Sequence, residues 1–118
     1  MELFDTTQLT LAAALRGADA RQSALAGNLA NVDTPGYARK DVDFEGALQS
    51  ALAGSGDPSG VSFTAQTDGS APVRADGNSV DVDQENSELA QNALTYDALS
   101  RVASARIDIL KTAMGVAQ

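Results

Sequence analysis

The sequence predicts a mainly α-helical protein in which long N- and C-terminal helices pair as a coiled-coil-like hairpin. Two observations carry this prediction: both ends show apolar residues at heptad spacing, and the stretch between them is rich in turn-forming residues. Residues 1–33 and 80–118 are expected to form one helical core domain. Residues 34–79 are expected to be a variable middle segment with a turn, a short helix and an irregular or β-hairpin insertion.

The N-terminal helix is predicted from positions spaced alternately four and three residues apart between 4 and 32. Seven of these nine positions are apolar, which is typical of a helix seam. The positions are Phe4, Gln8, Leu11, Leu15, Ala18, Gln22, Leu25, Leu29 and Val32. Asp5, Thr6 or Thr7 would cap the start of the helix. Gly17 and Gly27 each weaken it by roughly 1 kcal/mol relative to alanine, so this helix needs a partner.

The C-terminal helix repeats the pattern along a similar line of positions. This line consists of Leu89, Ala93, Tyr96, Ser100, Ala103, Ile107, Leu110 and Met114. A second, adjacent line adds Leu99, Val102, Ile109 and Ala113. Two neighbouring apolar lines predict a face wide enough to contact more than one helix. Asp81 or Asp83 is the expected N-cap; with Asp81 as the cap, Gln84 would occupy the N3 position of a capping box.

The middle of the chain reads as short elements. Residues 41–52 favour a short helical turn, and residues 54–60 form a loop by composition. Residues 61–65 alternate like a strand, residues 67–70 read as a turn, and residues 71–74 would return as a second strand. This small hairpin has too little apolar surface to be a domain of its own.

Composition excludes several classes of function. The net charge is −8, and residues 32–83 carry nine acids and three bases, which argues against nucleic-acid binding. The chain has no cysteine, so it can form neither a disulfide nor a thiolate metal site. No apolar run approaches the roughly 20 residues of a membrane span. The first residues lack the basic region of a cleavable secretion signal.

The residue types in the chain give little support for an enzymatic function. The absence of histidine and cysteine removes the most common general base and the soft nucleophile. The pairs Asp41/Asp43 and Asp81/Asp83 would share a face in an extended segment and are candidate ligands for a hard cation or for acid–base work, but solvated acids or helix caps are the much simpler explanation. Residues 76–87 fail the calcium-loop pattern, because valine, aspartate and serine stand at positions that need other residues. We predict no catalytic residue, no metal site and no cofactor.

The end of the first helix is the most informative stretch of the chain. Pro35 disfavours helix at Thr34, so the helix must end by about residue 33. Gly36 suits the third position of a type II turn, which needs a positive φ, and Asn31 is able to act as a left-handed cap. A helix stop followed by a turn leaves Asn28 and Tyr37 without a role.

A family resemblance supplies that role. Residues 29–37 read Leu-Ala-Asn-Val-Asp-Thr-Pro-Gly-Tyr and resemble the Ala-Asn-x-x-Thr-x-Gly-Tyr motif of the axial proteins of the bacterial flagellar rod and hook. Residues 38–44 are similar to the proximal rod proteins within that family. A second similar block spans residues 76–85 and 92–96. The chain is shorter than the hook and distal rod proteins, and residues 92–101 lack the Arg-x-Tyr-Glu-Ala-Asn pattern expected of the other small rod protein.

The resemblance implies a non-enzymatic structural subunit of the proximal rod, stacked with its neighbours into a helical tube for motility. It implies a basal-body location in the periplasm and type III export without a cleavable signal peptide. The implied partners are further copies of the chain, rod proteins of the FlgC, FlgF and FlgG types, the adaptor FliE and the export gate. The implied assembly motif consists of Asn28, Asn31, Thr34, Pro35, Gly36 and Tyr37. The helix seam consists of Leu11, Leu15, Leu25, Leu29, Leu89, Tyr96, Ile107, Leu110 and Met114.

Two alternatives remain open at this point. A soluble helical-hairpin adaptor or chaperone of a secretion system would explain the seam but not residues 31–37. A carboxylate-based metal hydrolase would need tight divalent-cation binding that depends on Asp81 and Asp83.

Overall fold

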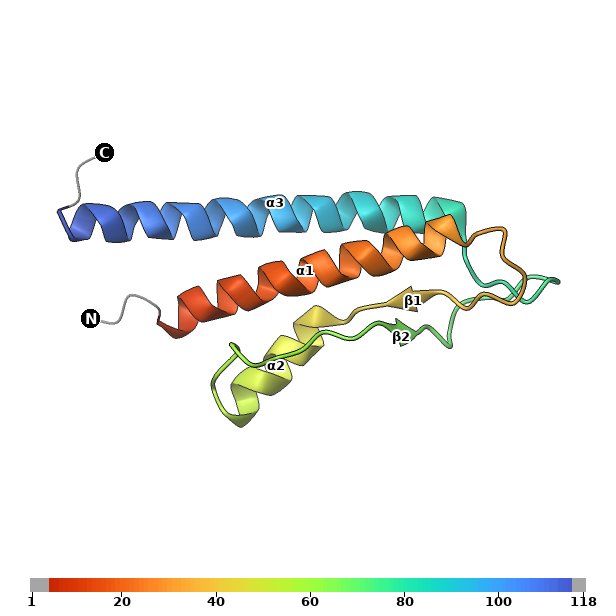
Figure 1. Ribbon diagram of the computed structural model, residues 1–118, viewed down its shortest axis with the longest axis horizontal. Coiled ribbons are helices and arrows are strands. Elements are labelled where there is room, and N and C mark those ends of the chain that lie inside the picture. Colours follow the sequence, from red (N-terminus) through yellow and green to blue (C-terminus); the bar gives the residue numbers. More distant parts are fainter. Residues whose placement is uncertain (1–4, 116–118) are drawn as a thin grey trace.

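The computed structural model describes residues 5–115, and this part of the chain contains three helices and one small sheet (Figure 1). The helices are α1 (Thr6–Ala30), α2 (Phe44–Gly54) and α3 (Val82–Ala113), and the strands are β1 (Lys40–Asp41) and β2 (Gln66–Thr67). The predicted mainly α class, with long terminal helices and a small sheet between them, is confirmed. Phe4, the first predicted seam position, lies outside the described residues.

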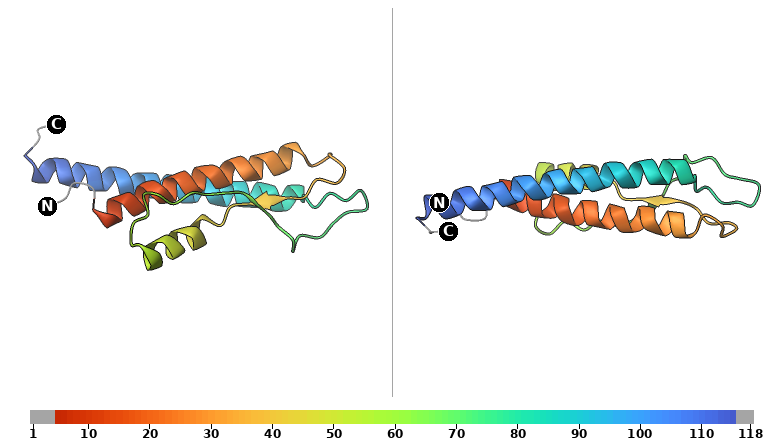
Figure 2. Two further views of the ribbon diagram at one scale, coloured as in Figure 1. Left: turned by 60° about the horizontal axis from the view of Figure 1, so that its bottom comes forward. Right: turned by 90° about the horizontal axis from the view of Figure 1, so that it is seen from above.

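The elements form a flat, elongated molecule with α1 in the middle. Its principal extents are 62 × 33 × 14 Å. The helix α3 runs along one side of α1, and α2 with the two strands lies on the other side (Figures 1 and 2). The start of α1 and the end of α3 lie at one end, while the loop after α1 and the loop before α3 meet at the opposite end. Among the described residues, no helix is long and apolar enough to cross a membrane.

The helix α1 begins and ends through side-chain caps. Asp5 is the N-cap, and its carboxylate accepts a hydrogen bond from the Gln8 backbone N–H at 2.9 Å. Asn31 is the C-cap, but its φ of −105° is not left-handed, so that expectation is wrong. The reason is that its side-chain amide donates back to the Gly27 carbonyl at 2.8 Å, which ends the helix without a positive φ.

A small core lies between α1 and the middle segment. Its buried apolar members are Ala13, Ala14, Ala18, Val42, Phe44 and Leu48. The Phe44 ring reaches the α1 backbone because Gly17 has no side chain: a Cβ at that position would lie 2.4 Å from Phe44 Cβ. The alanines of α1 therefore serve close packing rather than large individual burial.

The small sheet differs from the predicted hairpin. Residues 61–65 do not pair with residues 71–74; instead β2 pairs antiparallel with β1, placing Lys40 opposite Thr67 and Asp41 opposite Gln66. The physical reason is that residues 61 and 63 pack against the α1 core, while the strand partner comes from the chain just after the first turn. The predicted turn at residues 67–70 is present, since the Asp68 carboxylate accepts from the Ser70 N–H at 3.0 Å.

The start of α3 agrees with the predicted N-cap. The Asp81 carboxylate accepts hydrogen bonds from the backbone N–H groups of Asp83 and Gln84. The reciprocal half of a capping box is absent, because the Gln84 side chain donates to Glu88 at 2.9 Å.

Candidate assembly site

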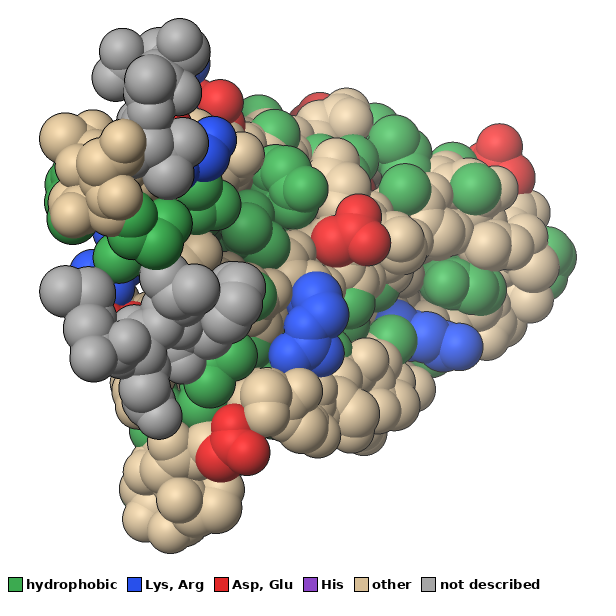
Figure 3. All heavy atoms as spheres, turned by 60° about the vertical axis from the view of Figure 1, so that its left-hand side comes forward, with side chains coloured by type: hydrophobic (Ala, Val, Ile, Leu, Met, Phe, Trp, Pro, Cys, Tyr) green, Lys and Arg blue, Asp and Glu red, His purple; other side chains and the backbone are tan. Residues whose placement is uncertain are grey.

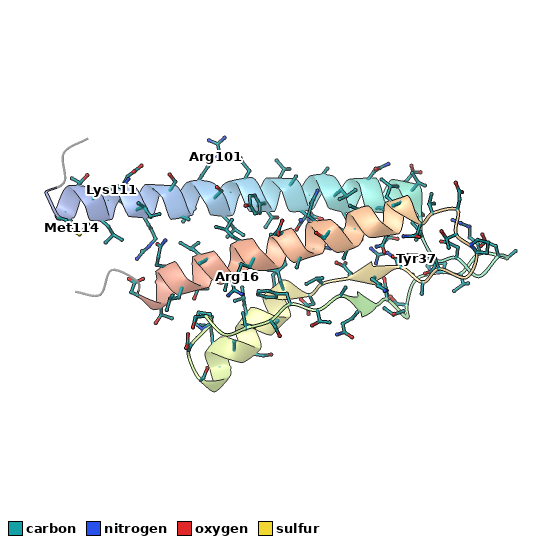
Figure 4. All side chains as sticks on the ribbon, in the orientation of Figure 1. Arg16, Tyr37, Arg101, Lys111 and Met114 are labelled. Atoms are coloured by element: carbon teal, nitrogen blue, oxygen red, sulfur yellow. The ribbon has the colours of Figure 1, made fainter. Side chains whose placement is uncertain are left out.

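The six residues of the assembly motif surround the end of α1 and the start of β1. Asn28 is completely buried and bonds both main-chain groups of Lys40: its Nδ2 donates to the carbonyl at 2.7 Å, and its Oδ1 accepts from the N–H at 2.9 Å. One side-chain amide thus acts as a strand partner for the returning chain. Tyr37 is half-buried beside it, and its hydroxyl lies 3.4 Å from Asn28 Oδ1 (Figure 4).

The turn itself follows the chemistry of its sequence. The Tyr37 N–H donates to the Thr34 carbonyl at 3.2 Å, and Gly36 has a φ of +77°, as the type II turn requires. Thr34 also donates through its hydroxyl to Asn31 Oδ1 at 3.1 Å. Pro35 and Gly36 are exposed at the tip. The turn is locally determined and leaves its outer surface open.

The second sequence block holds this turn in place. The Asn78 side chain is completely buried, and its amide nitrogen lies within 3.0 Å of the carbonyl oxygens of Asn31, Val32 and Thr34. The last carbonyl groups of a helix have no hydrogen-bond partner within the helix, and the Asn78 amide supplies a donor for such groups. The Gly36 N–H donates to Asp76, and the Ser79 N–H donates to Tyr37. The two similar blocks therefore form one structural unit.

Arg74 adds positive charge at the same place. Its guanidinium donates to the carbonyls of Val32 and Val80, joining the end of α1 to the chain that leads into α3. A cation beside the negative end of a helix dipole is favourable.

A buried ion pair connects the motif to α3. Arg39 is 2 % exposed and Glu85 is fully buried, and Arg39 Nε lies 2.6 Å from Glu85 Oε1. The same guanidinium donates to Asp68 at 2.7 Å and to Glu88 at 3.1 Å. Hydrogen bonds to Glu85 raise the pKa of Arg39. Burial acts in the opposite direction, and the hydrogen bond to Asp68 adds to the increase. This one side chain thus joins the chain before β1, the residue after β2 and the start of α3.

Arg21 extends the network along α1. It forms a two-pronged contact with the Asp41 carboxylate at 2.8 and 3.1 Å and reaches Glu88 at 3.2 Å. The hydrogen bond to Asp41 raises the pKa of Arg21. Burial tends to raise the pKa of Asp41, but the hydrogen bonds from Arg21 and from the Val42 N–H outweigh it, and the pKa lies below its ordinary value.

Three of the four carboxylates that suggested metal chemistry have structural partners. Asp81 caps α3, Asp43 caps α2 by accepting from the Gly46 N–H at 3.0 Å, and Asp41 pairs with Arg21. Within residues 5–115, no group of three or more histidine, cysteine, aspartate or glutamate residues is arranged to hold a metal ion.

The N-terminal half of the predicted helix seam lies inside the molecule. Leu25 is completely buried, and Leu11, Leu15 and Leu29 are half-buried. The side of α3 that meets α1 is more polar than its sequence pattern suggests. Asn92 donates to the Ala18 carbonyl at 2.8 Å, and Arg106 pairs with Asp5 at 2.9 Å.

The C-terminal half of the seam is divided between interior and surface. Leu89 and Leu110 are half-buried, whereas Tyr96, Ile107 and Met114 are 45 %, 42 % and 55 % exposed. Most residues of α3 that turn toward α1 lie one position before a residue of the predicted line, whereas Ala103 and Leu110 belong to the line itself. The residues that turn toward α1 are Glu85, Glu88, Asn92, Thr95, Leu99, Ala103, Arg106 and Leu110.

Apolar side chains therefore remain at the surface of α3. Val102 is 51 % exposed and Ile109 is 67 % exposed, in addition to the seam residues named above. Figure 3 shows hydrophobic side chains at the surface along the upper part of the molecule, over α3, interrupted by single charged ones.

Comparison with known proteins gives this geometry a biological context. A family model described as flagella basal body rod protein matches residues 9–37, which span most of α1 and the turn. The chain is 35 % identical to the flagellar basal body rod protein FlgB of Bacillus subtilis, over 97 % of each chain. It is 34 % identical to FlgB of Aeromonas hydrophila over 80 % of this chain and 81 % of that protein. FlgB of Salmonella typhimurium is 35 % identical over 64 % of this chain and 69 % of that protein.

The chain belongs to the FlgB family. It is a structural subunit of the flagellar basal-body rod, as its sequence motifs predicted. The match at residues 9–37 includes all six motif residues and the four seam leucines of α1.

Several residues that build this site were not predicted from the sequence. They are Arg21, Arg39, Arg74, Asn78, Ser79, Glu85 and Glu88. Most of them lie within or beside the two similar blocks, which is the signal that could have identified them. Their pairing needs the fold, because each contact joins residues far apart in the chain.

Proposed function

We propose that this rod subunit assembles with neighbouring subunits by burying the apolar residues that α3 leaves exposed. The observation that carries the proposal is the exposure of Tyr96, Val102, Ile107, Ile109 and Met114 on one helix. Single exposed apolar residues are ordinary, but a row along one element is typical of an interaction surface.

These residues lie on two flanks of α3. Tyr96, Ile107 and Met114 are spaced by eleven and seven residues, so they share one flank, whereas Val102 and Ile109 are seven apart and share another. A helix with an apolar flank on each side is able to meet a neighbour on both sides. Contacts between unlike surfaces build an open helical assembly when the rotation from one copy to the next does not close a ring.

The assembly motif contributes a joint at one end of the molecule in this proposal. Pro35 and Gly36 are exposed, and Tyr37 is half-buried, so the turn offers a rigid surface to a neighbour. Tyr37→Ala should reduce rod assembly while expression stays intact. Tyr37→Phe is the matched variant, because it keeps the ring and removes only the hydroxyl. Normal assembly of the alanine variant would argue against the joint.

Family membership supports further parts of the proposal. We place the subunit in the proximal rod, in the periplasm, after type III export without a cleavable signal peptide, and with no enzymatic activity. Its proposed partners are further copies, rod proteins of the FlgC, FlgF and FlgG types, FliE and the export gate. The helical core of residues 1–33 and 80–118 would carry most of the contacts, with the turn at residues 35–37 as the joint, and the rest of residues 34–79 would vary.

The test compares a flank variant with a matched surface variant. Ile109→Asp should abolish concentration-dependent self-association in sedimentation and fail to restore motility to cells lacking the natural chain. Ser104→Asp introduces the same charge on an exposed polar position of α3 and serves as the control. Circular dichroism should give the same helix content for both. If Ile109→Asp associates and supports motility as the natural chain does, the flank is not the assembly surface; a helical small oligomer that never extends would favour an adaptor.

A further inference from the structure

A groove lies where α1 and α3 meet, beside the flank that carries Tyr96. It has a volume of about 400 Å³ and is lined by Ala18, Asp19 and Gln22 from α1 and by Asn92, Ala93 and Tyr96 from α3. Asp19 is exposed, and Tyr96 is 45 % exposed. The groove therefore places an acidic group and an aromatic ring at the surface close to a buried polar residue.

The polar residue is Asn92, which is 1 % exposed. Its Nδ2 donates to the Ala18 carbonyl and to Gln22 Oε1, both at 2.8 Å. The Ala18 carbonyl can only accept, so the amide nitrogen must face it, and the orientation of the Asn92 side chain is fixed. Its Oδ1 is then buried, and no donor among the described residues reaches it.

A buried acceptor without a donor is unfavourable, and native proteins rarely keep one without a reason. Asn92 Oδ1, the Asp19 carboxylate and the Tyr96 ring together form a site of defined chemistry. A carboxylate attracts a cation, an amide oxygen accepts its hydrogen bond, and an aromatic face favours its charge. This combination suits a guanidinium or ammonium group.

We propose that this groove receives the Arg101 side chain of a neighbouring copy of the chain. The inference rests on the self-assembly proposed above and identifies one of its contacts. The Arg101 side chain is 79 % exposed and points away from α1 (Figure 4). Its partner within the chain is Asp97, one turn earlier, in a surface pair of the kind that contributes little.

The other arginines have stronger reasons to stay where they are. Each of them already bonds a carboxylate or a main-chain carbonyl from a distant segment; these arginines are Arg16, Arg21, Arg39, Arg74 and Arg106. Arg101 lies on the face of α3 that points away from α1, where it is free to meet a neighbouring copy.

Charge reversal tests the pairing. Asp19→Arg and Arg101→Asp should each weaken self-association about tenfold or more in sedimentation, and the double variant should recover most of the loss. Glu45→Arg, an exposed acid at the start of α2 on the other side of α1 from the groove, is the matched control and should leave association within about twofold. A double variant that is no better than the weaker single variant would overturn the proposal, and so would an unchanged Asp19→Arg.

A second measurement does not depend on charge. The chain has no cysteine, so Ala93→Cys places a single thiol on the rim of the groove. Its labelling by a maleimide should slow at least tenfold when the chain associates, while Ala90→Cys, exposed one turn away, stays reactive. Association with Ala93→Cys still fully reactive would overturn the groove alone. A natural chain that stays monomeric at every concentration would instead overturn the self-assembly on which the inference rests.

Discussion

Arg39 and Glu85 form an ion pair in which both side chains are almost completely removed from solvent. Arg39 Nε lies 2.6 Å from Glu85 Oε1, and Asn28 donates to the other oxygen of the same carboxylate at 3.1 Å. The pair thus joins the chain after the first turn to the first turn of α3, with α1 as a third participant. Burying two charges is costly unless all their hydrogen bonds are made, so this arrangement specifies one alignment of α1 and α3.

Removing one member of this pair should strongly destabilise the fold. We expect Arg39→Ala to lower the free energy of unfolding by about 3–5 kcal/mol, because the Glu85 carboxylate stays buried without its counter-ion. Arg101→Ala removes the exposed pair with Asp97 and should leave stability nearly unchanged. Urea unfolding followed by circular dichroism compares the two. Similar losses in both variants would show that the buried pair has no special role.

The network also predicts how stability depends on pH. Hydrogen bonds from Ser70 and Arg39 lower the pKa of Asp68 below its ordinary 3.8, and Arg21 lowers that of Asp41. The unfolded chain therefore binds protons at a higher pH than the folded chain. The stabilisation is fully present above about pH 5 and is lost as the pH falls through 3.8 and below.

The measurement is the urea midpoint between pH 6 and pH 2.5. The midpoint should be level down to about pH 5 and then fall, and Asp68→Asn should start lower and fall less. Equal slopes for Asp68→Asn and the natural chain would contradict the role of this carboxylate.

Some elements were predictable from the sequence because they depend on local chemistry. Asp81 as an N-cap and Gly36 at a positive φ depend on neighbours within four residues, and local chemistry determined both. The pairing of β1 with β2 depends instead on Asn28, which holds Lys40, and on Arg39, whose carbonyl accepts from the Asp68 N–H. No local pattern encodes those contacts.

The rotation of α3 about its own axis shows a second limit of prediction from the sequence. Hydrophobic periodicity finds the apolar side of a helix and assumes that this side faces the interior of the same chain. Here Glu85, Asn92 and Arg106 occupy the side toward α1, and each is held by a hydrogen bond to α1 or to a residue beside it. Ile107 and Met114 are left outside. The pattern in α3 fits a rod subunit whose apolar residues serve its neighbours.

Gly17 and Gly27 offer a matched pair of substitutions within α1. A Cβ at Gly17 would lie 2.4 Å from Phe44 Cβ, whereas a Cβ at Gly27 would have no atom closer than the Tyr37 hydroxyl at 4.0 Å. Gly17→Ala should therefore lower stability by about 1–3 kcal/mol through overpacking. Gly27→Ala should raise it by about 0.5–1 kcal/mol, because alanine favours the helix. Thermal unfolding of both variants distinguishes the two effects, and a stabilising Gly17→Ala would show that α2 does not pack closely on α1.

Asn28 provides the most specific test of the motif, because its two side-chain atoms have different partners. Nδ2 donates to the Lys40 carbonyl and to Glu85, while Oδ1 accepts from the Lys40 N–H. Asn28→Ala removes both contacts and leaves buried main-chain groups unpaired, at an expected cost of about 1–3 kcal/mol. Asn28→Asp keeps the acceptor but places a second carboxylate oxygen where Nδ2 faced the Lys40 carbonyl and Glu85.

Asn28→Asp should therefore be the more harmful change at pH 7, although it is nearly the same size as asparagine. Protonation of the new carboxyl would restore a donor, so the difference between the two variants should shrink as the pH falls from 7 to 5. Urea unfolding at both values measures it. If Asn28→Asp is at least as stable as Asn28→Ala at pH 7, the amide nitrogen does not hold Lys40 and Glu85 together, and the motif asparagine acts through its oxygen alone.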